Sequence, residues 1–468
     1  MIDARDWKEI AGDDYDWRVT AKPERPYIHD YTKTMTMKMF LAEPDGRGGS
    51  RVFIDIDKAA DIIRRVDRMT MGAPKILYLV GWQYNGHDDR YPAWHEGNPA
   101  IKRAEDRTPI ESIRWLMEEG SRHHTTVSVH INMYDAYENS PLWNTYVEKG
   151  LLNTTTDGKP DKAGVWNGLQ AYSINYGREW ETGFAKKRID EILELLPLER
   201  AGTVHIDAFH CRPDMGRGQG YEDSQAARRK IFRYWRDRGI DVTSEFLYDE
   251  PVFGYEKPGP DQLIGLQPMA WHFSQKLSDY IDRPAGLICG GSAGHRGKPG
   301  GEKLGALFGE NIVGEPLWAD WKNRTFRSGW EGHFLEDFCL KYLPFRFLNG
   351  LHRLSAACTP GEITAKLSKN VTTMLNGPVI LQGGEKLREG NDVLLPADWI
   401  SKKTLITYSK DGGTRTWTLP RPLKGASSAS VQDLTTEGPG KETIRRVSGS
   451  RMTFPYLPGQ AYIVTARD

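Results

Sequence analysis

Two short segments decide the fold of this chain: Thr203-Val-His-Ile-Asp-Ala-Phe-His210 and Ile240-Asp-Val-Thr-Ser-Glu-Phe246. Each is a predicted buried strand that ends in a carboxylate, Asp207 in the first and Glu245 in the second. Residues 221–239, between them, place apolar side chains among Arg and Lys at helical spacing. Strand, helix and strand form a βαβ unit, whose two strands run parallel. We therefore expect Asp207 and Glu245 at the same end of one sheet.

The same alternation of β and α extends from residue 55 to 355 and predicts a catalytic (β/α)₈ barrel of the TIM type. It contains no GxGxxG or GxxxxGK[ST] motif of a nucleotide-binding sheet. Residues 1–54 are expected to form a short N-terminal β-rich lead-in, and residues 356–468 a C-terminal β-sandwich domain that braces the barrel. The predicted helices are 57–71, 108–119, 179–196, 221–239 and 331–342. The predicted strands are 75–81, 125–132, 263–267, 285–289 and 311–314 in the barrel, with a hairpin of 404–409 and 414–419 and a last strand at 459–465 in the C-terminal domain.

Composition narrows the class of partner. Lys+Arg and Asp+Glu both number 63 in the 468 residues, and this balance argues against nucleic acid or an anionic membrane as a partner. The 15 Trp and 20 Tyr residues suit a carbohydrate substrate, although most aromatic side chains serve a core. The first residues lack the apolar region of a signal peptide, and the four cysteines form no CxxC pair. These features predict a cytoplasmic protein with free thiols.

Candidate site residues follow the predicted strand ends, because those ends line the site of a barrel. The 75–81 strand leads into Gly81-Trp-Gln-Tyr-Asn-Gly-His-Asp-Asp-Arg-Tyr-Pro92, and the next strand ends at His130-Ile-Asn132. Two facing carboxylates in such a crevice are the equipment of a glycoside hydrolase. The predicted catalytic pair is Asp207 and Glu245, and the predicted substrate contacts are Trp82, Gln83, His87, Asp88, His130, Asn132, Trp166, His205 and Trp271.

Structural roles compete with each of these assignments. Aspartate, the residue at position 207, is also common as a helix N-cap or as a buried salt-bridge partner. Asp249 and Glu250 compete with Glu245, although their loop position favours solvated side chains. His130 has the pattern of a core histidine, and Asp88 that of a turn residue. Any single tryptophan of the set is more often a core residue than a sugar platform.

Several of these motifs together resemble glycoside hydrolase family 101, the endo-α-N-acetylgalactosaminidases, and more loosely the related retaining α-N-acetylgalactosaminidases. The resemblance rests on short stretches in the same order between residues 75 and 420. They are the 81–92 loop, Val129-His-Ile-Asn132, Val204-His-Ile-Asp-Ala208, Val242-Thr-Ser-Glu-Phe246, Gly332-His-Phe-Leu-Glu-Asp-Phe338, Lys341-Tyr-Leu-Pro344 and Asp411-Gly-Gly-Thr-Arg-Thr-Trp-Thr-Leu-Pro420.

The resemblance implies a (β/α)₈ barrel and a retaining mechanism on an α-linked N-acetylgalactosamine or galactose-like sugar. Position by position, it implies that Asp207 is the nucleophile, that Glu245 is the general acid/base and that Asp88 binds sugar hydroxyls. It also implies that Trp166 lines the subsite and that no metal or other cofactor is needed. Members of the family are usually larger secreted proteins that act on mucin-type glycans. A cytoplasmic enzyme does not meet intact mucin, so we expect small imported oligosaccharides or glycosides as substrates, and the sequence leaves both exo and endo action open.

Two other classes of function stay open on the sequence. One is a metal-dependent barrel hydrolase that would use His87, Asp88, His130, His205 and Asp207 as ligands. The other is a sugar-binding protein without catalytic activity. Chelation separates the first from a metal-free glycosidase, and hydrolysis that is lost in Asp207→Asn while binding is retained separates the second.

Overall fold

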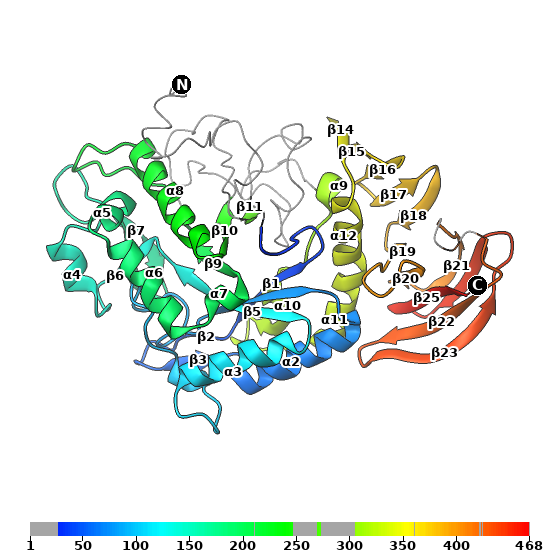
Figure 1. Cartoon of the computed structure of the whole chain (residues 1–468), viewed down its shortest axis with the longest axis horizontal. Coiled ribbons are helices and arrows are strands. Elements are labelled where there is room, and N and C mark those ends of the chain that lie inside the picture. The colour runs from blue at the N-terminus through cyan, green and yellow to red at the C-terminus, as the bar shows by residue number, and fades with distance from the viewer. Residues whose placement is uncertain are drawn as a thin grey trace.

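A six-stranded parallel sheet forms the centre of the N-terminal part of the molecule (Figure 1). The computed structural model describes residues 27–209, 211–246, 269–272, 305–359, 361–420, 423 and 425–467. All five strand pairings in this sheet are parallel, so the carboxyl ends of the strands share one edge. In spatial order the strands are β1 (Met35–Phe40), β4 (Lys75–Val80), β5 (Thr125–Asn132), β9 (Thr203–Asp207), β10 (Asp241–Phe246) and β11 (Met269–His272).

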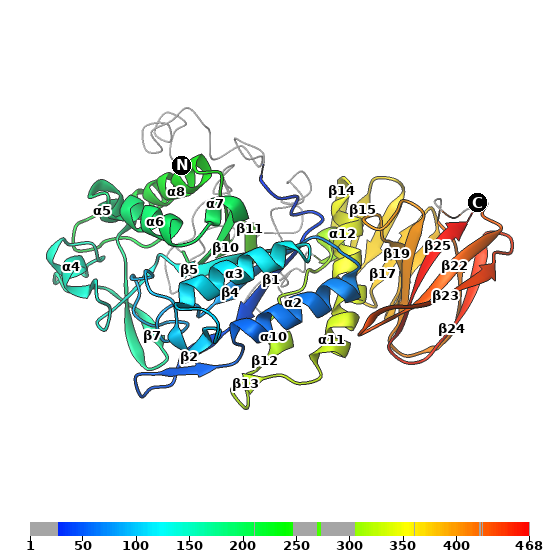
Figure 2. The ribbon, with the colours of Figure 1, turned by 60° about the horizontal axis from the view of Figure 1, so that its bottom comes forward.

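Amphipathic helices connect these strands, as the sequence predicts. Helix α2 (Ile56–Thr70) precedes β4, α3 (Pro109–Ser121) precedes β5, and α8 (Tyr221–Asp237) joins β9 to β10. Figure 2 shows α2 and α3 running side by side in front of β4 and β5. Thr108 and Glu111 form a capping box at the start of α3, which explains why the helix begins there. Among the helices of the described residues, none is long and apolar enough to cross a bilayer.

The single helix predicted over 179–196 is wrong. The structure has α5 (Tyr176–Glu181) and α6 (Phe184–Leu195), followed by the short α7 (Leu198–Ala201) before β9. Gly183 separates α5 from α6 in a left-handed conformation with φ of 80°. The apolar spacing continues through the break, so periodicity alone does not reveal it.

The described part of the N-terminal segment, residues 27–54, contains three strands, but β1 belongs to the central sheet. All six residues of β1 are buried, and β1 pairs in parallel with β4 in the register Met35↔Lys75. Strands β2 (Ala42–Pro44) and β3 (Ser50–Val52) then form a small hairpin. A strand buried on both faces is typical of a parallel sheet, where helices cover the two sides.

The C-terminal part contains a ten-stranded antiparallel sheet, as the short predicted strands indicate. A separate pair, β21 (Gly413–Thr418) and β24 (Arg451–Tyr456), packs on it through a second apolar core that includes Leu405, Trp417 and Phe454. In spatial order the large sheet consists of β14 (Arg353–Thr359), β15 (Glu362–Leu367), β16 (Val371–Met374), β17 (Val379–Gln382), β18 (Glu385–Glu389), β19 (Asp392–Pro396), β20 (Thr404–Ser409), β25 (Gln460–Arg467), β22 (Ser428–Thr435) and β23 (Gly438–Arg446).

The predicted hairpin of 404–409 with 414–419 is wrong. Strand β20 pairs with β19 and β25, whereas β21 pairs with β24. Gly412 makes the crossing possible, because it has φ of 75° and a Cβ there would lie 2.9 Å from the backbone nitrogen of Pro458. The turn therefore carries the chain from one sheet to the other.

The two parts are joined by helices and by direct contacts. Helix α11 (Trp330–Asp337) continues through a π-helical turn, Phe338–Tyr342, into α12 (Leu343–Asn349), so the helix predicted over 331–342 is one part of a longer helical segment. The Trp399 indole donates to the carbonyl of Thr70 at 2.9 Å, and Glu437 lies 3.4 Å from Arg65 on α2. The C-terminal sheet is thereby fastened to α2.

Of the strands predicted in the barrel, one is wrong and two lie outside the described residues. Residues 311–314 form no strand, but the Lys38 backbone nitrogen donates to the carbonyl of Val313 at 2.8 Å, so this segment lies alongside β1. The predicted strands 263–267 and 285–289 lie outside the described residues.

Candidate active site

A pocket of about 280 Å³ opens at the carboxyl end of the parallel sheet, and we call it the carboxylate pocket. Four of the predicted site residues line it: Asp207, Asp88, His87 and His130. They come from the ends of β9, β4 and β5, as expected for parallel strands that share one edge. Among the described residues, the lining consists of Lys38, Phe40, Glu43, His87, Asp88, His130, Asn167, Asp207, Glu315 and Trp321.

Two glycines hold the loop with His87 and Asp88 close to β2. Gly81 has φ of 75° and Gly86 has φ of 123°. A Cβ on Gly81 would lie 2.0 Å from the carbonyl oxygen of Ala42, and one on Gly86 would lie 2.5 Å from it. This close approach lets the His87 backbone nitrogen donate to that carbonyl at 2.9 Å. The GWQYNGHDD sequence therefore serves to place His87 and Asp88 at the strand ends.

The imidazoles of His87 and His130 flank the Asp207 carboxylate. His87 Nε2 lies 4.0 Å from Asp207 Oδ2 and 3.3 Å from Asp88 Oδ2. His130 Nε2 lies 3.7 Å from Asp207 Oδ1. The Asp207 and Asp88 side chains are each only 15% exposed. Two carboxylates thus share a small, largely enclosed space with two imidazoles.

The pKa values of the two histidines are shifted in opposite directions. Burial lowers the pKa of His87, but the carboxylates of Asp88, Asp207 and Glu315 outweigh burial and leave the pKa raised above its ordinary value. Burial lowers the pKa of His130 well below its ordinary value, and the imidazoles of His205 and His87 lower it further. His87 is therefore the more readily protonated of the two imidazoles, and His130 favours its neutral form.

Left-handed backbone conformations gather around the carboxylate pocket. Asp88 has φ of 56°, Ala208 has φ of 55° and Asn167 has φ of 48°. Such conformations are costly for residues other than glycine and concentrate at functional sites. The Asn167 amide donates to the carbonyl of His87 at 2.9 Å, so Asn167 is bonded directly to the residue that precedes Asp88.

Four predicted substrate contacts lie behind the pocket lining instead. The Trp82 indole donates to the carbonyl of His130 at 2.9 Å, and the Gln83 amide donates to the Tyr91 hydroxyl at 2.9 Å. Asn132 accepts from the backbone of Tyr134 at 2.7 Å. These contacts tie together the segments that carry His87 and His130. His205 is fully buried, and its Nδ1 lies 2.8 Å from the Thr243 hydroxyl.

A buried carboxyl lies next to this layer. Asp135 is only 4% exposed, and its Oδ2 accepts from the Asn132 amide at 2.8 Å. Burial, and secondly the charge of Asp88, raise the pKa of Asp135 to about 7. Asp135 is therefore neutral in mildly acidic solution and ionises near neutral pH.

The remaining predicted site residues are Trp166, Glu245 and Trp271. Trp166 is 43% exposed in β7 (Lys162–Trp166), which pairs with β8 (Leu169–Ser173), and it does not line the carboxylate pocket, whereas its neighbour Asn167 does. In the register of β10 with β9, Ser244 pairs with Ile206, so position 245 comes directly beside position 207. The side chains of Glu245 and of Trp271, which lies in β11, are outside the described residues.

One group of side chains has the spacing of metal ligands. The ligand atoms of His87, His130 and Asp207 all lie within 4.8 Å of one another. A histidine must be deprotonated before it binds a metal, and the carboxylates around His87 favour its protonated form. The metal-dependent alternative therefore has a geometric basis but an electrostatic obstacle at His87.

Asn167, on the 166–176 loop that the sequence indicates beside the site, lines the pocket, whereas five lining residues were not predicted from the sequence: Lys38, Phe40, Glu43, Glu315 and Trp321. Lys38 could have been predicted from the sequence. A lysine inside the apolar strand MTMKMF costs free energy to bury unless it has a polar partner or a function. Lys38 is 5% exposed, and two residues further along the same face Phe40 also reaches the pocket. Glu315 and Trp321 are more than 100 positions beyond Asp207, and no local pattern connects them to it.

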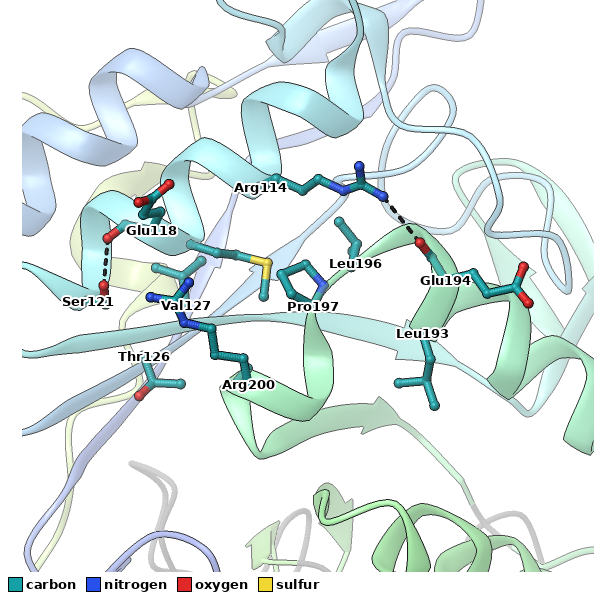
Figure 3. A pocket seen from close by; sticks show the side chains of 12 residues that line it. Arg114, Glu118, Ser121, Thr126, Val127, Leu193, Glu194, Leu196, Pro197 and Arg200 are labelled. Atoms are coloured by element: carbon teal, nitrogen blue, oxygen red, sulfur yellow. Dashed lines mark hydrogen bonds between the residues drawn. The ribbon is translucent and has the colours of Figure 1, made fainter.

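A second pocket, the α3–α6 groove, has a volume of about 370 Å³. It lies at the opposite end of the sheet, between the last turns of α3 and α6 and the start of β5 (Figure 3). The Arg114 guanidinium donates to the carbonyl of Glu194 at 3.2 Å across it, and Met117, Val127 and Leu193 supply apolar walls.

Comparison with known proteins links the chain to one family. The model of glycoside hydrolase family 101, endo-alpha-N-acetylgalactosaminidase, matches residues 52–252. The chain resembles family 101. The predicted resemblance is thereby confirmed, and the match contains the 81–92 loop, Asp207 and Glu245.

A curated relative from Renibacterium salmoninarum, provisionally named as an endo-alpha-N-acetylgalactosaminidase, is 25% identical over 437 residues. That alignment covers 87% of this chain but only 25% of the relative, so the chain spans about a quarter of its length.

Solved structures of the alpha-N-acetylgalactosaminidase NagBb from Bifidobacterium bifidum share the fold. Its GalNAc complex has a TM-score of 0.51 at 12% identity, covering 75% of this chain and 57% of that one. Its complex with Gal-NHAc-DNJ has a TM-score of 0.50 at 12% identity, covering 78% and 58%. At this identity the similarity concerns the fold alone.

Proposed function

We propose that this protein is a retaining glycoside hydrolase that cleaves α-linked N-acetylgalactosamine or galactose-like glycosides. Asp207 is the nucleophile, and Glu245 is the general acid/base. The carrying observation is the meeting of Asp207 with Asp88 in a small open pocket at the carboxyl end of a parallel sheet. The match to family 101 over residues 52–252 supports the same assignment.

The strand register supports the catalytic pair. Neighbouring strands lie about 4.8 Å apart, and positions 207 and 245 stand at the same level of β9 and β10. A retaining glycosidase needs its two carboxyl groups about 5 Å apart. Asp207 then attacks the anomeric carbon while Glu245 protonates the leaving oxygen, and Glu245 afterwards deprotonates the water that releases the sugar.

The surrounding residues fit roles in this cycle. Asp88, on the other side of His87, is placed to accept hydrogen bonds from sugar hydroxyls. The imidazolium of His87 between Asp88 and Asp207 reduces the repulsion of two carboxylates in one pocket, which favours an ionised nucleophile. Neutral His130 contributes no charge and limits the freedom of the Asp207 carboxylate.

The proposal also covers the closure of the barrel, the location of the protein in the cell and the size of its substrates. A closed (β/α)₈ barrel is supported by the parallel order of six strands and by the contact of residue 313 with β1 at the far edge of the sheet. We retain cytoplasmic localisation and small oligosaccharide substrates as predictions. Cell fractionation and a comparison of substrate lengths test them.

The test of the function is hydrolysis of aryl α-glycosides of N-acetylgalactosamine, of galactose and of a core disaccharide. We expect turnover of at least one of them, with the α anomer as the first product in a proton NMR time course. No turnover of any donor would overturn the substrate class. A β anomer as the first product would overturn the retaining mechanism.

A further inference from the structure

Two imidazoles and one carboxylate in the carboxylate pocket lie close enough together to share an ion. One ligand atom each from His87, His130 and Asp207 lies within 4.8 Å of the other two. Among the residues that the structure describes, no second group of three His, Cys, Asp or Glu side chains has this spacing. Geometry therefore singles out these three side chains as candidate ligands.

The separations are close to those around a bound zinc ion. Zinc holds nitrogen and oxygen ligands at about 2.0–2.2 Å in a tetrahedron, so neighbouring ligand atoms stand about 3.4 Å apart. His130 Nε2 lies 3.7 Å from Asp207 Oδ1, and His87 Nε2 lies 4.0 Å from Asp207 Oδ2. The excess is a few tenths of an ångström at each pair. Rotation of the side chains is enough to close such gaps.

The charges in the pocket also favour a cation. The carboxylates of Asp88, Asp207 and Glu315 act on His87, and the Lys38 ammonium opposes them. Carboxylates that favour a proton on His87 also attract a divalent ion, so the ion and the proton compete for the imidazole. The pocket volume of about 280 Å³ leaves space for a water molecule as a fourth ligand.

The ligand types determine the class of ion. Imidazole nitrogen suits zinc, nickel and copper, whereas magnesium and calcium prefer oxygen ligands. The His130 side chain is 2% exposed and that of His87 is 21% exposed, so both rings are held by their surroundings before an ion arrives. A transition-metal ion such as zinc therefore fits this group better than calcium does.

The contacts behind the two imidazoles differ from those of a resident metal site. A histidine that holds a resident metal almost always bonds through its other ring nitrogen to a carboxylate, a carbonyl or water. The Nδ1 atoms of His87 and His130 are buried and have no hydrogen-bond partner among the described residues. An ion bound here therefore lacks the outer support that makes binding permanent, and it exchanges with solution.

We propose that zinc binds reversibly to His87, His130 and Asp207 and thereby inhibits the protein. In the proposed function Asp207 attacks the anomeric carbon. A carboxylate oxygen that donates its electron pair to zinc cannot donate the same pair to carbon. The ion also takes space that the reacting sugar needs, so zinc and substrate exclude one another. The inhibition rests on the proposed function, whereas the binding of zinc does not.

Zinc binding is measured first, by competition with a coloured chelator on the full chain after dialysis against EDTA. We expect one tightly bound ion per chain. Loss of an outer partner alone costs about 10–100-fold in metal affinity, so loss of a ligand in His87→Gln or His130→Gln should weaken binding at least about tenfold. His87→Gln alone suffices if the buried His130 variant fails to fold.

A matched control is His124→Gln. His124 is 60% exposed and lies 3.2 Å from Asp67, before β5 and so at the other end of the sheet. This variant should bind zinc with unchanged affinity. Equal affinity in wild type and both pocket variants, or loss of binding in His124→Gln, would overturn the site.

Inhibition is measured next, with the best aryl α-glycoside as substrate. Zinc should raise KM without lowering kcat, EDTA should restore the original KM, and calcium at the same concentration should have no effect. A lower kcat at unchanged KM would overturn the exclusion of substrate by zinc. Turnover that zinc does not affect would overturn the inhibitory site and leave the proposed function standing. Zinc binding without turnover of any donor would support the site and overturn the proposed function.

Discussion

The carboxylate pocket and the α3–α6 groove lie at opposite ends of the same parallel sheet, and the larger of the two is not the candidate active site. The groove has a volume of about 370 Å³ and the carboxylate pocket about 280 Å³. In the groove, Arg114 already donates to backbone carbonyls at the end of α6. In the pocket, Asp207, Asp88 and two imidazoles converge. The concentration of ionisable groups, rather than volume, marks the chemistry.

The direction of the strands explains the difference. Loops at the carboxyl ends carry side chains into a common space, whereas the amino ends receive helix termini whose polar groups need partners of their own. The α3–α6 groove is thus a packing feature and the carboxylate pocket a built site. Left-handed conformations occur at both ends, at Asp88, Asn167 and Ala208 beside the pocket and at Met71 and His124 before β4 and β5, so backbone strain does not separate the two ends. Five predictions can break or sharpen this contrast.

The largest effect is expected from Asp207→Asn, which removes the proposed nucleophile and preserves its shape. Hydrolysis should fall by at least about 10³-fold. In the groove, Arg200→Gln and Glu118→Gln should leave kcat/KM unchanged. Steady-state kinetics on the best donor measures all three variants. Substantial activity in Asp207→Asn, or a large loss in either groove variant, would contradict the contrast between the two ends.

A large loss of stability is expected from Gly86→Ala. The new Cβ would lie 2.5 Å from Ala42 backbone atoms at φ of 123°, so the loop that carries His87 must move. We expect a decrease of about 3 kcal/mol or more in the free energy of unfolding. Gly158→Ala is the matched control, because Gly158 has φ of 78° but nothing within 4 Å of a Cβ. It should cost about 1 kcal/mol, from conformation alone. Equal losses in urea unfolding would remove the role assigned to the close approach.

Asp135→Asn should stabilise the protein, more at high pH than at low pH. The folded pKa of Asp135 is raised to about 7, whereas the unfolded carboxyl titrates near 3.8. The folded state therefore loses stability as the pH rises from about 4 to 7, and the neutral amide avoids this loss. We expect a gain on the order of 2 kcal/mol at pH 8.5 that shrinks towards pH 4.5. Melting curves at both pH values measure it, and a gain independent of pH would contradict the buried charge.

His87→Gln should destabilise the protein more at low pH than at high pH. The folded pKa of His87 is raised, so protonation stabilises the fold fully below the unfolded pKa of 6.5. This stabilisation is lost as the pH rises through the folded pKa. The difference in unfolding free energy between the two proteins should therefore be larger at pH 5.5 than at pH 9. His333→Gln, which removes a histidine on α11 away from the carboxylate pocket, is the control.

The smallest effect is expected from chelation. The proposed cycle needs no metal, so exhaustive treatment with EDTA should leave kcat/KM unchanged. Added zinc should not raise it, although His87, His130 and Asp207 have suitable spacing. Loss of activity on chelation with recovery on zinc would favour the metal-dependent hydrolase. Metal analysis of the untreated protein by mass spectrometry provides the control.

Much of the frame was predictable, because it depends on local patterns. The apolar spacing of α2, α3 and α8 and the short apolar runs of β4, β5, β9 and β10 are properties of neighbouring residues. The capping box of Thr108 and Glu111 is equally local. From these elements follow a parallel sheet and the placement of Asp207 and position 245 at one end of it. The break at Gly183 was missed because it interrupts the backbone without interrupting the apolar pattern.

The site could be predicted only in part, since its walls come from distant segments. Four lining residues could be predicted from the sequence because they lie at or just after strand ends: His87, Asp88, His130 and Asp207. Lys38, Glu315 and Trp321 reach the carboxylate pocket because β1 joins the central sheet and because a segment beyond residue 310 packs beside it. Trp82 and Asn132 were predicted to contact substrate but lie behind the pocket lining, because their hydrogen-bond partners lie there.

The sequence by itself determined the alternation of strand and helix, the two strand ends with carboxylates and the resemblance to family 101. Each of these depends on residues that are close together in the chain. Only the tertiary structure decided which side chains face the carboxylate pocket, that β21 pairs with β24 rather than β20, and that Trp321 lies at the rim beside Phe40. The physical reason is that periodicity acts over a few residues. The meeting of residues more than a hundred positions apart depends instead on sheet register and close packing, which single segments do not encode.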